Sequence, residues 1–282
     1  AKALDGCIGT MAGAEKYIEP VFEAAKDLKV IARLGVGWDA VDVDAATSHG
    51  VVLAMAFGSN HESVADLAFS MMGALMTRLF TYQTQITGGG WQAQTHDSLW
   101  KSTIGIIGLG RIGKAIAKRG EAFGLKIVYN GRSKQADVTY PFYASLEEMA
   151  CACDILMVST PGGPQTKNLI DAKILDALGP NGILINIARG TVVDEPALVK
   201  ALQDKRILTA GLDVFAEEPK VPAELLAMDH VVLLPHVGSA SGPTRDLMSG
   251  LVIENLTSWD AGRGPVTPVA ETPWRNGAAR AQ

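Results

Sequence analysis

Short apolar runs alternate along the chain with longer segments in which apolar residues recur at helical spacing. The runs have the length of strands and lie at 29–35, 51–56, 103–110, 126–131, 154–160, 182–188 and 230–236. Strands that alternate with helical segments usually pair in parallel, with each helix as the crossover. The pattern therefore predicts an α/β fold with parallel sheets. Two segments do not follow this pattern. One is a polar and aromatic connector at 87–100, and the other is a tail at 263–282, which we expect to be a loose end.

The clearest helical periodicity spans 61–79. Its apolar stripe consists of Val64, Leu67, Ala68, Met71, Met72, Leu75, Met76 and Leu79. Ser59, with Glu62 three residues later, has the spacing of a capping box at a helix start. We therefore predict one long amphipathic helix, whose methionine-rich stripe packs in the core or against a second subunit.

A glycine-rich turn lies between one predicted strand and the helical segment that follows it. The turn GLGRIG supplies the candidate contacts Gly108, Gly110, Arg111, Ile112 and Gly113. The G-x-G-x-x-G motif alone is a weak signal, but a further strand at 126–129 completes the context of a dinucleotide site. Unpaired N–H groups at the start of a helix favour an anion, so the turn predicts binding of a pyrophosphate.

The residues after the second strand of this unit indicate which dinucleotide binds. An NAD site usually has an acidic residue there, which accepts hydrogen bonds from the ribose hydroxyls. In this chain the place is held by Asn130, Gly131, Arg132, Ser133 and Lys134. A carboxylate would repel the 2′-phosphate of NADP, whereas a guanidinium can pair with it through two N–H bonds. We therefore predict NADP(H) as the preferred cofactor and NAD(H) as the alternative; the structural interpretation is a solvated basic turn.

Composition narrows the classes of protein. The chain has 282 residues, 48% of them hydrophobic and 20% charged, which is enough to bury a core in each of two domains. A net charge of -5 gives no general attraction to nucleic acid or to anionic lipid. No apolar run reaches the ~20 residues that a membrane span needs. We therefore expect neither a nucleic-acid partner nor a membrane.

The chain has three cysteines, Cys7, Cys151 and Cys153. They are too few and too unevenly spaced for a disulfide framework, so we expect a reducing compartment, the cytoplasm. Cys151 and Cys153 lack the C-x-x-C spacing of a metal or redox pair and have no histidine nearby, which favours ordinary packing. The sequence therefore predicts no metal site.

Chemically reactive side chains follow several of the predicted strands. Arg189 comes directly after an apolar run and should lie at the carboxyl end of a strand, the edge at which open parallel sheets bind ligands. Asp213, Glu218 and His236 follow further strand-like runs. Taken singly, each has a structural interpretation, namely an arginine at a strand end, an acidic turn before a proline and a histidine in a proline-bounded loop. Single residues therefore do not decide the function.

These motifs occur in a fixed order from about Lys29 to Pro268. They are ARLGVGWDAVD, SVADLA, GIIGLGRIG, STPGGPQT, INIARGTVVDEPAL, GLDVFAEEP and LLPHVGSA. In this combination the chain resembles the D-isomer-specific 2-hydroxyacid dehydrogenases. The stretches GRSK, LDALGPNGILINIARG and VVLLPHVGSASGPTR most resemble the glyoxylate, hydroxypyruvate and hydroxyphenylpyruvate reductases, a branch that commonly uses NADPH. The resemblance thus implies NADPH, the same cofactor that the positive charge of the turn at 131–134 predicts.

The resemblance implies two Rossmann- or flavodoxin-like domains with parallel sheets, the cofactor domain being inserted into the substrate domain. The substrate domain would comprise 1–59 and a return segment with the tail at 240–282, and the NADP-binding domain would comprise 60–239. Family members carry a further strand and helix before the region that matches LDGCIGT, so we expect about 40 or more residues to precede Ala1. Members are usually homodimers joined through the cofactor domain, where the long helix and Trp91 offer a surface.

The resemblance also implies a role for each candidate side chain. His236 would be the acid–base residue, Glu218 its partner and Arg189 the clamp on the substrate carboxylate. Asp213 would contact the nicotinamide end. The remaining contacts would be Thr160, Pro161, Thr166, Ala188 and Gly238 for the cofactor and the N–H groups of Val36 and Gly37 for the substrate carboxylate.

These roles suit the reduction of a ketone. The alkoxide that hydride transfer leaves needs a proton, for which an imidazole is the usual donor, and a substrate carboxylate needs a cationic partner. We therefore predict an oxidoreductase that reduces a small 2-keto acid, of the glyoxylate or hydroxypyruvate type, to the D-2-hydroxy acid.

Three other functions share this fold. Formate dehydrogenase carries Gln at the place of Glu218, because its reaction transfers no proton, and Glu218 argues against it. Phosphoglycerate dehydrogenase is an alternative, although its preference for NAD fits poorly with Asn130 and Arg132. A dinucleotide-sensing corepressor that recruits partners is the non-catalytic alternative, and it would show little turnover.

Overall fold

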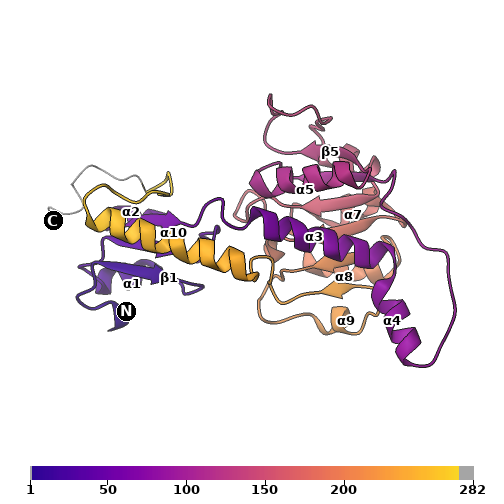
Figure 1. The fold of residues 1–282 in the computed structure, drawn as a ribbon, viewed down its shortest axis with the longest axis horizontal. Helices are drawn as coiled ribbons and strands as arrows, with labels where there is room; N and C mark the ends of the chain where they lie inside the picture. Colours follow the sequence, from indigo (N-terminus) through magenta and orange to yellow (C-terminus); the bar gives the residue numbers. More distant parts are fainter. Residues whose placement is uncertain (1, 273–282) are drawn as a thin grey trace. The chain divides into compact units, whose positions relative to one another are not determined.

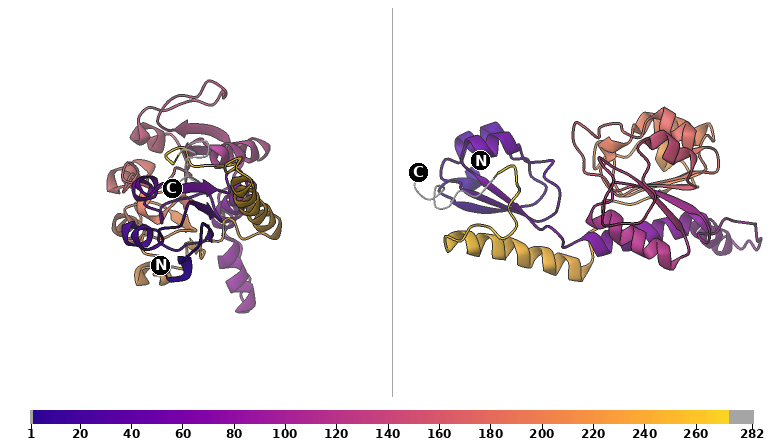
Figure 2. Two further views of the ribbon diagram at one scale, coloured as in Figure 1. Left: turned by 90° about the vertical axis from the view of Figure 1, so that its left-hand side faces the viewer. Right: turned by 90° about the horizontal axis from the view of Figure 1, so that it is seen from above.

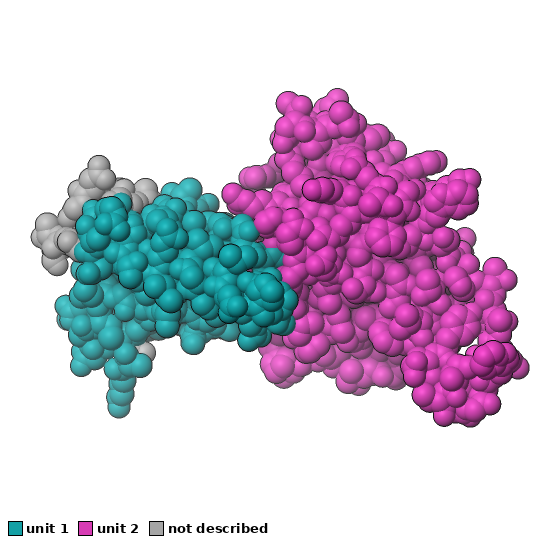
Figure 3. All heavy atoms as spheres, in the orientation of Figure 1, with its two compact units in different colours: residues 1–60, 240–282 teal, residues 61–239 magenta. Residues whose placement is uncertain are grey.

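The computed structural model describes residues 2–272 (Figure 1 and Figure 2). The loose end expected at 263–282 is wrong for its described part, because Val269 and Thr272 are only 1% and 2% exposed and the Thr272 hydroxyl accepts from the Leu53 N–H at 3.0 Å. The part from 273 onward lies outside the described residues. The chain divides into two compact units, one made of residues up to 60 and from 240 onward, and one made of residues 61–239 (Figure 3). The expected boundary between 59 and 60 differs from this division by one residue, and the expected boundary between 239 and 240 coincides with it.

The first unit is a three-stranded parallel sheet with helices packed against it. The strands, in the order β1-β2-β3 across the sheet, are β1 (Gly9–Ala12), β2 (Val30–Arg33) and β3 (Val52–Met55). The helical elements are η1 (Lys2–Leu4), α1 (Glu19–Ala24), α2 (Val43–Ser48) and α10 (Gly242–Asp260). The buried Asn255 binds Thr267, whose hydroxyl in turn binds the Met55 carbonyl oxygen, so the segment after α10 is tied to the end of β3.

The second unit is a parallel sheet covered by helices on both faces. Within the described residues it has six strands in the order β5-β4-β6-β7-β8-β9, namely β4 (Thr103–Ile107), β5 (Lys126–Asn130), β6 (Ile155–Val158), β7 (Ile183–Asn186), β8 (Thr209–Leu212) and β9 (Val232–Leu233). The helical elements are α3 (His61–Met76), α4 (Leu79–Thr87), α5 (Arg111–Ala122), α6 (Leu146–Cys151), α7 (Ala172–Leu178), η2 (Gly190–Val192), α8 (Glu195–Gln203) and α9 (Ala223–Leu226). α3 and α5 pack on one face, and α6, α7 and α8 pack on the other. The predicted α/β fold with parallel sheets is confirmed.

The strand order reverses at the centre of this sheet. From β4 the chain crosses to β5 on one side and then returns to β6 on the other. In open parallel sheets such a reversal makes the carboxyl edge beside the first strand the place where ligands bind. The glycine turn after β4 lies at this edge.

The long helix predicted over 61–79 is wrong in its extent. α3 ends at Met76, Arg78 adopts a left-handed conformation with φ 51°, and α4 begins at Leu79. The apolar stripe is confirmed as core as far as Met76, which is 5% exposed, whereas Leu79 is 53% exposed. The burial that stabilises one straight helix therefore ends with α3, and the chain turns where it ends.

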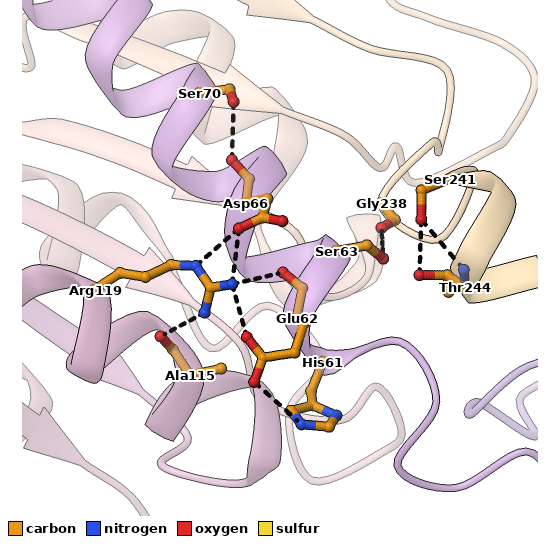
Figure 4. Close-up of polar contacts among 10 residues, drawn as sticks. All are labelled: His61, Glu62, Ser63, Asp66, Ser70, Ala115, Arg119, Gly238, Ser241 and Thr244. Atoms are coloured by element: carbon orange, nitrogen blue, oxygen red, sulfur yellow. Dashed lines mark hydrogen bonds and ion pairs between the residues drawn. The ribbon is translucent and has the colours of Figure 1, made fainter. Parts of the chain in front are cut away.

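The start of α3 is held by Arg119 of α5 (Figure 4). The guanidinium lies 2.7 Å from the Glu62 carboxylate and 2.7 Å from the Asp66 carboxylate, and it donates to the Ala115 carbonyl oxygen at 3.1 Å. The hydrogen bond from Arg119 holds the pKa of Glu62 below its usual value. The predicted capping box is wrong, because Glu62 binds Arg119 and the Ser59 hydroxyl donates to a backbone carbonyl oxygen at 2.7 Å.

No single helix in the described part of the chain is long and apolar enough to cross a membrane. α3 and α4 reach the required length and composition only as a pair, and they are bent by 60° at their junction. α3 itself is packed in the core of the second unit.

Candidate active site

The glycine turn joins β4 to α5, and two of its three glycines have no room for a side chain. Gly108 has φ 90°, and a Cβ there would lie 2.8 Å from the Cα of Thr160. A Cβ at Gly113 would lie 2.3 Å from the Gly108 carbonyl oxygen. At Gly110, in contrast, a Cβ would meet nothing within 4 Å, and no described side chain caps α5, which begins at Arg111. The turn therefore leaves open space in front of uncapped helix N–H groups, which suits the pyrophosphate of a dinucleotide.

The loop after β6 packs against this turn. The Ser159 hydroxyl donates to the Gly108 carbonyl oxygen at 2.7 Å, and the backbone of Thr160 lies directly against Gly108. The Thr166 hydroxyl donates to the Pro161 carbonyl oxygen at 2.8 Å. Of the expected contacts on this loop, Thr160 thus lies beside the glycine turn, and the Thr166 hydroxyl is engaged within the loop itself.

The basic turn follows β5, the strand next to β4. Its exposed residues are Arg132, Ser133 and Lys134. The Asn130 side chain donates to the carbonyl oxygens of Tyr143 at 2.9 Å and Ala144 at 3.4 Å. Its NH₂ group is therefore engaged within the chain, and Oδ1 is the side-chain atom left for a ligand.

A buried asparagine shapes the turn that carries Arg189. Asn186 is 1% exposed; it accepts from the Ala188 N–H at 3.0 Å and donates to the Arg189 carbonyl oxygen at 2.9 Å. These bonds turn the chain out of β7, so that Arg189 lies beyond the carboxyl end of the strand. Asn186 was not among the residues expected from the sequence, and its signal is a lone amide in an otherwise apolar run.

The turn after Arg189 lies against the loop that carries Glu218. A Cβ at Gly190 would lie 1.8 Å from the carbonyl carbon of Phe215 and 2.3 Å from the nitrogen of Ala216. The Phe215 N–H donates to Oε1 of Glu218 at 3.1 Å. The close approach at Gly190, which only a glycine permits, therefore fixes the spacing between the Arg189 turn and the Glu218 loop.

His236 and Glu218 form a hydrogen-bonded pair at the same edge of the sheet. Nδ1 of His236 lies 2.8 Å from Oε2 of Glu218, and the two side chains are 47% and 35% exposed. Because a carboxylate can only accept, the neutral imidazole carries its proton on Nδ1 and leaves Nε2 for a ligand. The pair can therefore exchange a proton with a bound molecule.

Asp213 holds the backbone that carries His236. Asp213 is 2% exposed, and its carboxylate accepts from the N–H groups of Val237 at 2.8 Å and Gly238 at 2.9 Å. The Gly238 carbonyl oxygen accepts from the Ser63 hydroxyl at 2.8 Å (Figure 4). Burial raises the pKa of the Asp213 carboxyl, and the two N–H bonds oppose that rise. His236 itself has φ 56°, a conformation that a non-glycine residue keeps only where its surroundings impose it.

The second unit alone brings together Arg189, Glu218 and His236, at the carboxyl edge of its sheet. Two further expected cofactor contacts, Ala188 and Gly238, are buried in the same loops. Val36 and Gly37 belong to the first unit, where they are half-buried in the loop that leaves β2. That loop lies at the carboxyl edge of the three-stranded sheet.

Comparison with known proteins identifies the family. The model for the NAD-binding domain of D-isomer-specific 2-hydroxyacid dehydrogenases matches residues 69–238. The chain is 39% identical to 2-ketogluconate reductase of Gluconobacter oxydans, over 92% of this chain and 85% of that protein. It is 42% identical to glyoxylate/hydroxypyruvate reductase A of Arabidopsis thaliana, over 86% of this chain and 79% of that protein.

A solved structure agrees with these relatives. The NADPH-dependent glyoxylate/hydroxypyruvate reductase of Sinorhizobium meliloti, determined with NADP and malonate, matches with a TM-score of 0.90 and 40% identity, over 98% of this chain and 88% of that chain. The expected reaction class, reduction of a 2-keto acid to a 2-hydroxy acid, and the expected class of cofactor, NADP(H) or NAD(H), are thereby confirmed. The chain therefore belongs to the D-isomer-specific 2-hydroxyacid dehydrogenase family.

Proposed function

We propose that this chain reduces glyoxylate, hydroxypyruvate or a similarly small 2-keto acid to the D-2-hydroxy acid, with NADPH as its preferred cofactor. The observation that supports this most is the His236–Glu218 pair beside the Arg189 turn. A 2-keto acid needs a proton for its carbonyl oxygen and a cation for its carboxylate, and this edge of the sheet offers both. The described cysteines are free, which supports the proposed cytoplasmic location.

The proton chemistry falls to two side chains. When bound, the cofactor supplies the hydride. The protonated ring of His236 gives the proton on Nε2 to the carbonyl oxygen of the substrate, and Glu218 holds the ring in place through Nδ1. Asp213 keeps the backbone of His236 in place by accepting from the two N–H groups that follow it.

Orientation of the substrate falls to Arg189. Its guanidinium can bind the carboxylate and the carbonyl oxygen together, which fixes the substrate and polarises the carbonyl. The N–H groups of Val36 and Gly37 are further proposed contacts for the carboxylate, because the flanking glycines allow a backbone to approach closely.

The proposed preference for NADPH depends on the basic turn. Arg132 and Ser133 bind the 2′-phosphate, and no carboxylate stands in the described stretch 131–136 to repel it. Asp137, the next acid along the chain, lies 2.6 Å from Nζ of Lys114, which offsets its charge. The glycine turn and the Thr160 loop hold the pyrophosphate end of the same molecule.

Arg189→Lys is expected to lower kcat/KM for the 2-keto acid by about tenfold or more, because lysine keeps the charge but loses the planar fork that binds two oxygens. Arg206→Lys is the matched control, since Arg206 pairs with Asp176 ahead of β8, at the other end of the strands. It should leave kcat/KM unchanged. If lysine substitutes freely at 189, the substrate clamp lies elsewhere.

We also propose a homodimer joined through the second unit. Large apolar side chains are exposed on α4 and on the connector after it, with Trp91 at 87% and Phe80 at 53%. An apolar groove of about 690 Å³ lies in the same unit and is lined in part by Phe80, Leu208 and Met228. Apolar surface of this kind usually contacts a partner. Sedimentation at assay concentration should show a dimer, and monomer alone would contradict the proposal.

A panel of 2-keto acids assayed with NADPH and with NADH tests the proposed function. Glyoxylate and hydroxypyruvate should be reduced, with a higher kcat/KM for NADPH. A main activity of NAD-dependent 3-phosphoglycerate oxidation would instead assign the phosphoglycerate dehydrogenase alternative. Nucleotide binding without turnover of any keto acid would assign the corepressor-like alternative.

A further inference from the structure

One side chain links the loop after β5 to the glycine turn. Gln135 lies three residues beyond Arg132 in the chain, and its Nε2 donates to the Leu109 carbonyl oxygen at 2.8 Å. Because a carbonyl oxygen can only accept, the NH₂ group and not Oε1 of Gln135 faces Leu109. The bond therefore joins the turn proposed for the pyrophosphate to the turn proposed for the 2′-phosphate.

The backbone of Gln135 is anchored as well. Its N–H donates to the Tyr129 hydroxyl at 2.7 Å. Tyr129 is 1% exposed, its ring lies against Phe142 with centroids 5.3 Å apart, and its backbone pairs with Pro141 and Tyr143. The packing and the backbone bonds of Tyr129 therefore fix its hydroxyl in place, and this hydroxyl in turn holds the backbone of Gln135.

These anchors leave little freedom to the residues between them. Only 131–134 separate Asn130, the last residue of β5, from Gln135, and Arg132 lies within this short span. A guanidinium pairs well with a phosphate only when its fork meets the oxygens in line. The spacing of the two turns also matters, because the pyrophosphate and the 2′-phosphate belong to one molecule. If the basic turn were displaced, the glycine turn would still bind the pyrophosphate, but Arg132 would miss the 2′-phosphate.

We propose that Gln135 is a positioning residue for cofactor selection, which holds Arg132 within reach of the 2′-phosphate by joining the basic turn to the Leu109 carbonyl. This rests on the NADPH preference of the proposed function. Loss of the amide lowers the affinity for a 2′-phosphorylated nucleotide and leaves the affinity for its unphosphorylated counterpart unchanged.

The same loop carries a second link that provides a control. Nζ of Lys114 lies 2.6 Å from Oδ2 of Asp137, with side chains 40% and 68% exposed. This ion pair joins the loop to α5 and does not involve the Leu109 carbonyl. Exposed pairs of this kind stabilise a protein little. Lys114→Met together with Asp137→Asn therefore removes one link of the loop at unchanged net charge, without touching the link made by Gln135.

The test compares the binding of 2′,5′-ADP and of 5′-AMP to the full chain by titration calorimetry, without any turnover. Gln135→Met keeps the length of the side chain and loses its NH₂ group. It should weaken 2′,5′-ADP binding about three- to tenfold, the worth of one hydrogen bond, and change 5′-AMP binding less than about twofold. Tyr129→Phe removes the second anchor and should act in the same direction. The double variant Lys114→Met/Asp137→Asn should leave the ratio of the two affinities as in the wild type.

Equal losses for the two nucleotides in Gln135→Met would overturn the proposal, because a general support of the fold would weaken both. No loss for either would overturn it as well. In turnover assays the same variant should raise KM for NADPH and keep kcat. If the wild type binds 2′,5′-ADP no more tightly than 5′-AMP, the NADPH preference itself fails and this proposal fails with it, a result that is recognised before any variant is made.

Discussion

His236→Gln is expected to lower kcat by roughly 10²- to 10⁴-fold while the binding of NADPH stays close to that of the wild type. Glutamine can still bond to the Glu218 carboxylate, which lies 2.8 Å from Nδ1 in the wild type, but its amide cannot give up a proton near neutral pH. The measurements are kcat at saturating 2-keto acid and NADPH affinity by fluorescence titration.

His230→Gln is the matched control. His230 also lies beside a carboxylate, with Nδ1 3.6 Å from Oδ1 of Asp229, and its side chain is 43% exposed. It precedes β9, however, whereas His236 follows that strand. The control should keep its turnover. Turnover close to the wild type in a folded His236→Gln protein would remove His236 from the reaction.

Arg132→Ala is expected to weaken NADPH binding by about 1.5–3 kcal/mol, the usual worth of a charge-assisted hydrogen bond, or roughly tenfold to a hundredfold in Kd. NADH lacks the 2′-phosphate and should be affected little. Because Arg132 is exposed, the contact should also weaken as salt is added. The measurement is kcat/KM for both cofactors at low and at high ionic strength.

Lys126→Ala controls for the loss of one positive charge. Lys126 is exposed and begins β5, whereas Arg132 follows the end of that strand. The Lys126→Ala variant should keep its kcat/KM for NADPH and for NADH. Equal losses for NADPH and NADH in Arg132→Ala would mean that Arg132 supports the loop without binding the phosphate, and the absence of an acid would then indicate tolerance of either cofactor.

The hydrogen bonds of Asn130 affect how a substitution at this position would change the preference from NADPH to NADH. A carboxylate at this place is what an NAD site usually has. In this chain the NH₂ group of Asn130 donates to the carbonyl oxygens of Tyr143 and Ala144. Asn130→Asp would set a carboxylate against those oxygens, so it should move the 143–144 segment as well as change the preference for cofactor.

The sequence predicts the parts of the fold whose burial is complete. β6 is apolar along its whole length and β7 as far as Ile185, because helices cover both faces of the sheet, and both strands were expected. β1 was not expected, since it is a short edge strand and Met11 on it is 66% exposed. β8 was expected only as a strand-like run before Asp213 and not among the seven apolar runs, because Gly211 must be small there, as a Cβ would lie 2.9 Å from Cε of Met71. Hydrophobic periodicity indicates which positions are buried, but it does not reveal a strand in which packing requires a small residue.

The candidate site shows the same limit. The glycine turn and the motifs around Arg189, Glu218 and His236 can be found in the sequence because their residue types suit a known chemistry. Asn186 and Gln135 were missed, because an asparagine in a strand or a glutamine in a loop has no chemical signature of its own. Their importance lies in which carbonyl and N–H groups they meet, and only the fold determines that.

The most direct test of the account is the reaction of the wild-type protein with hydroxypyruvate and NADPH, with the product separated by chiral chromatography. We expect one D-glycerate to form for each NADPH oxidised, because in the proposed mechanism His236, Glu218 and Arg189 together protonate and orient the 2-keto acid. NADPH that is bound but not oxidised in the presence of hydroxypyruvate and of glyoxylate would contradict it, and so would a product of the L configuration.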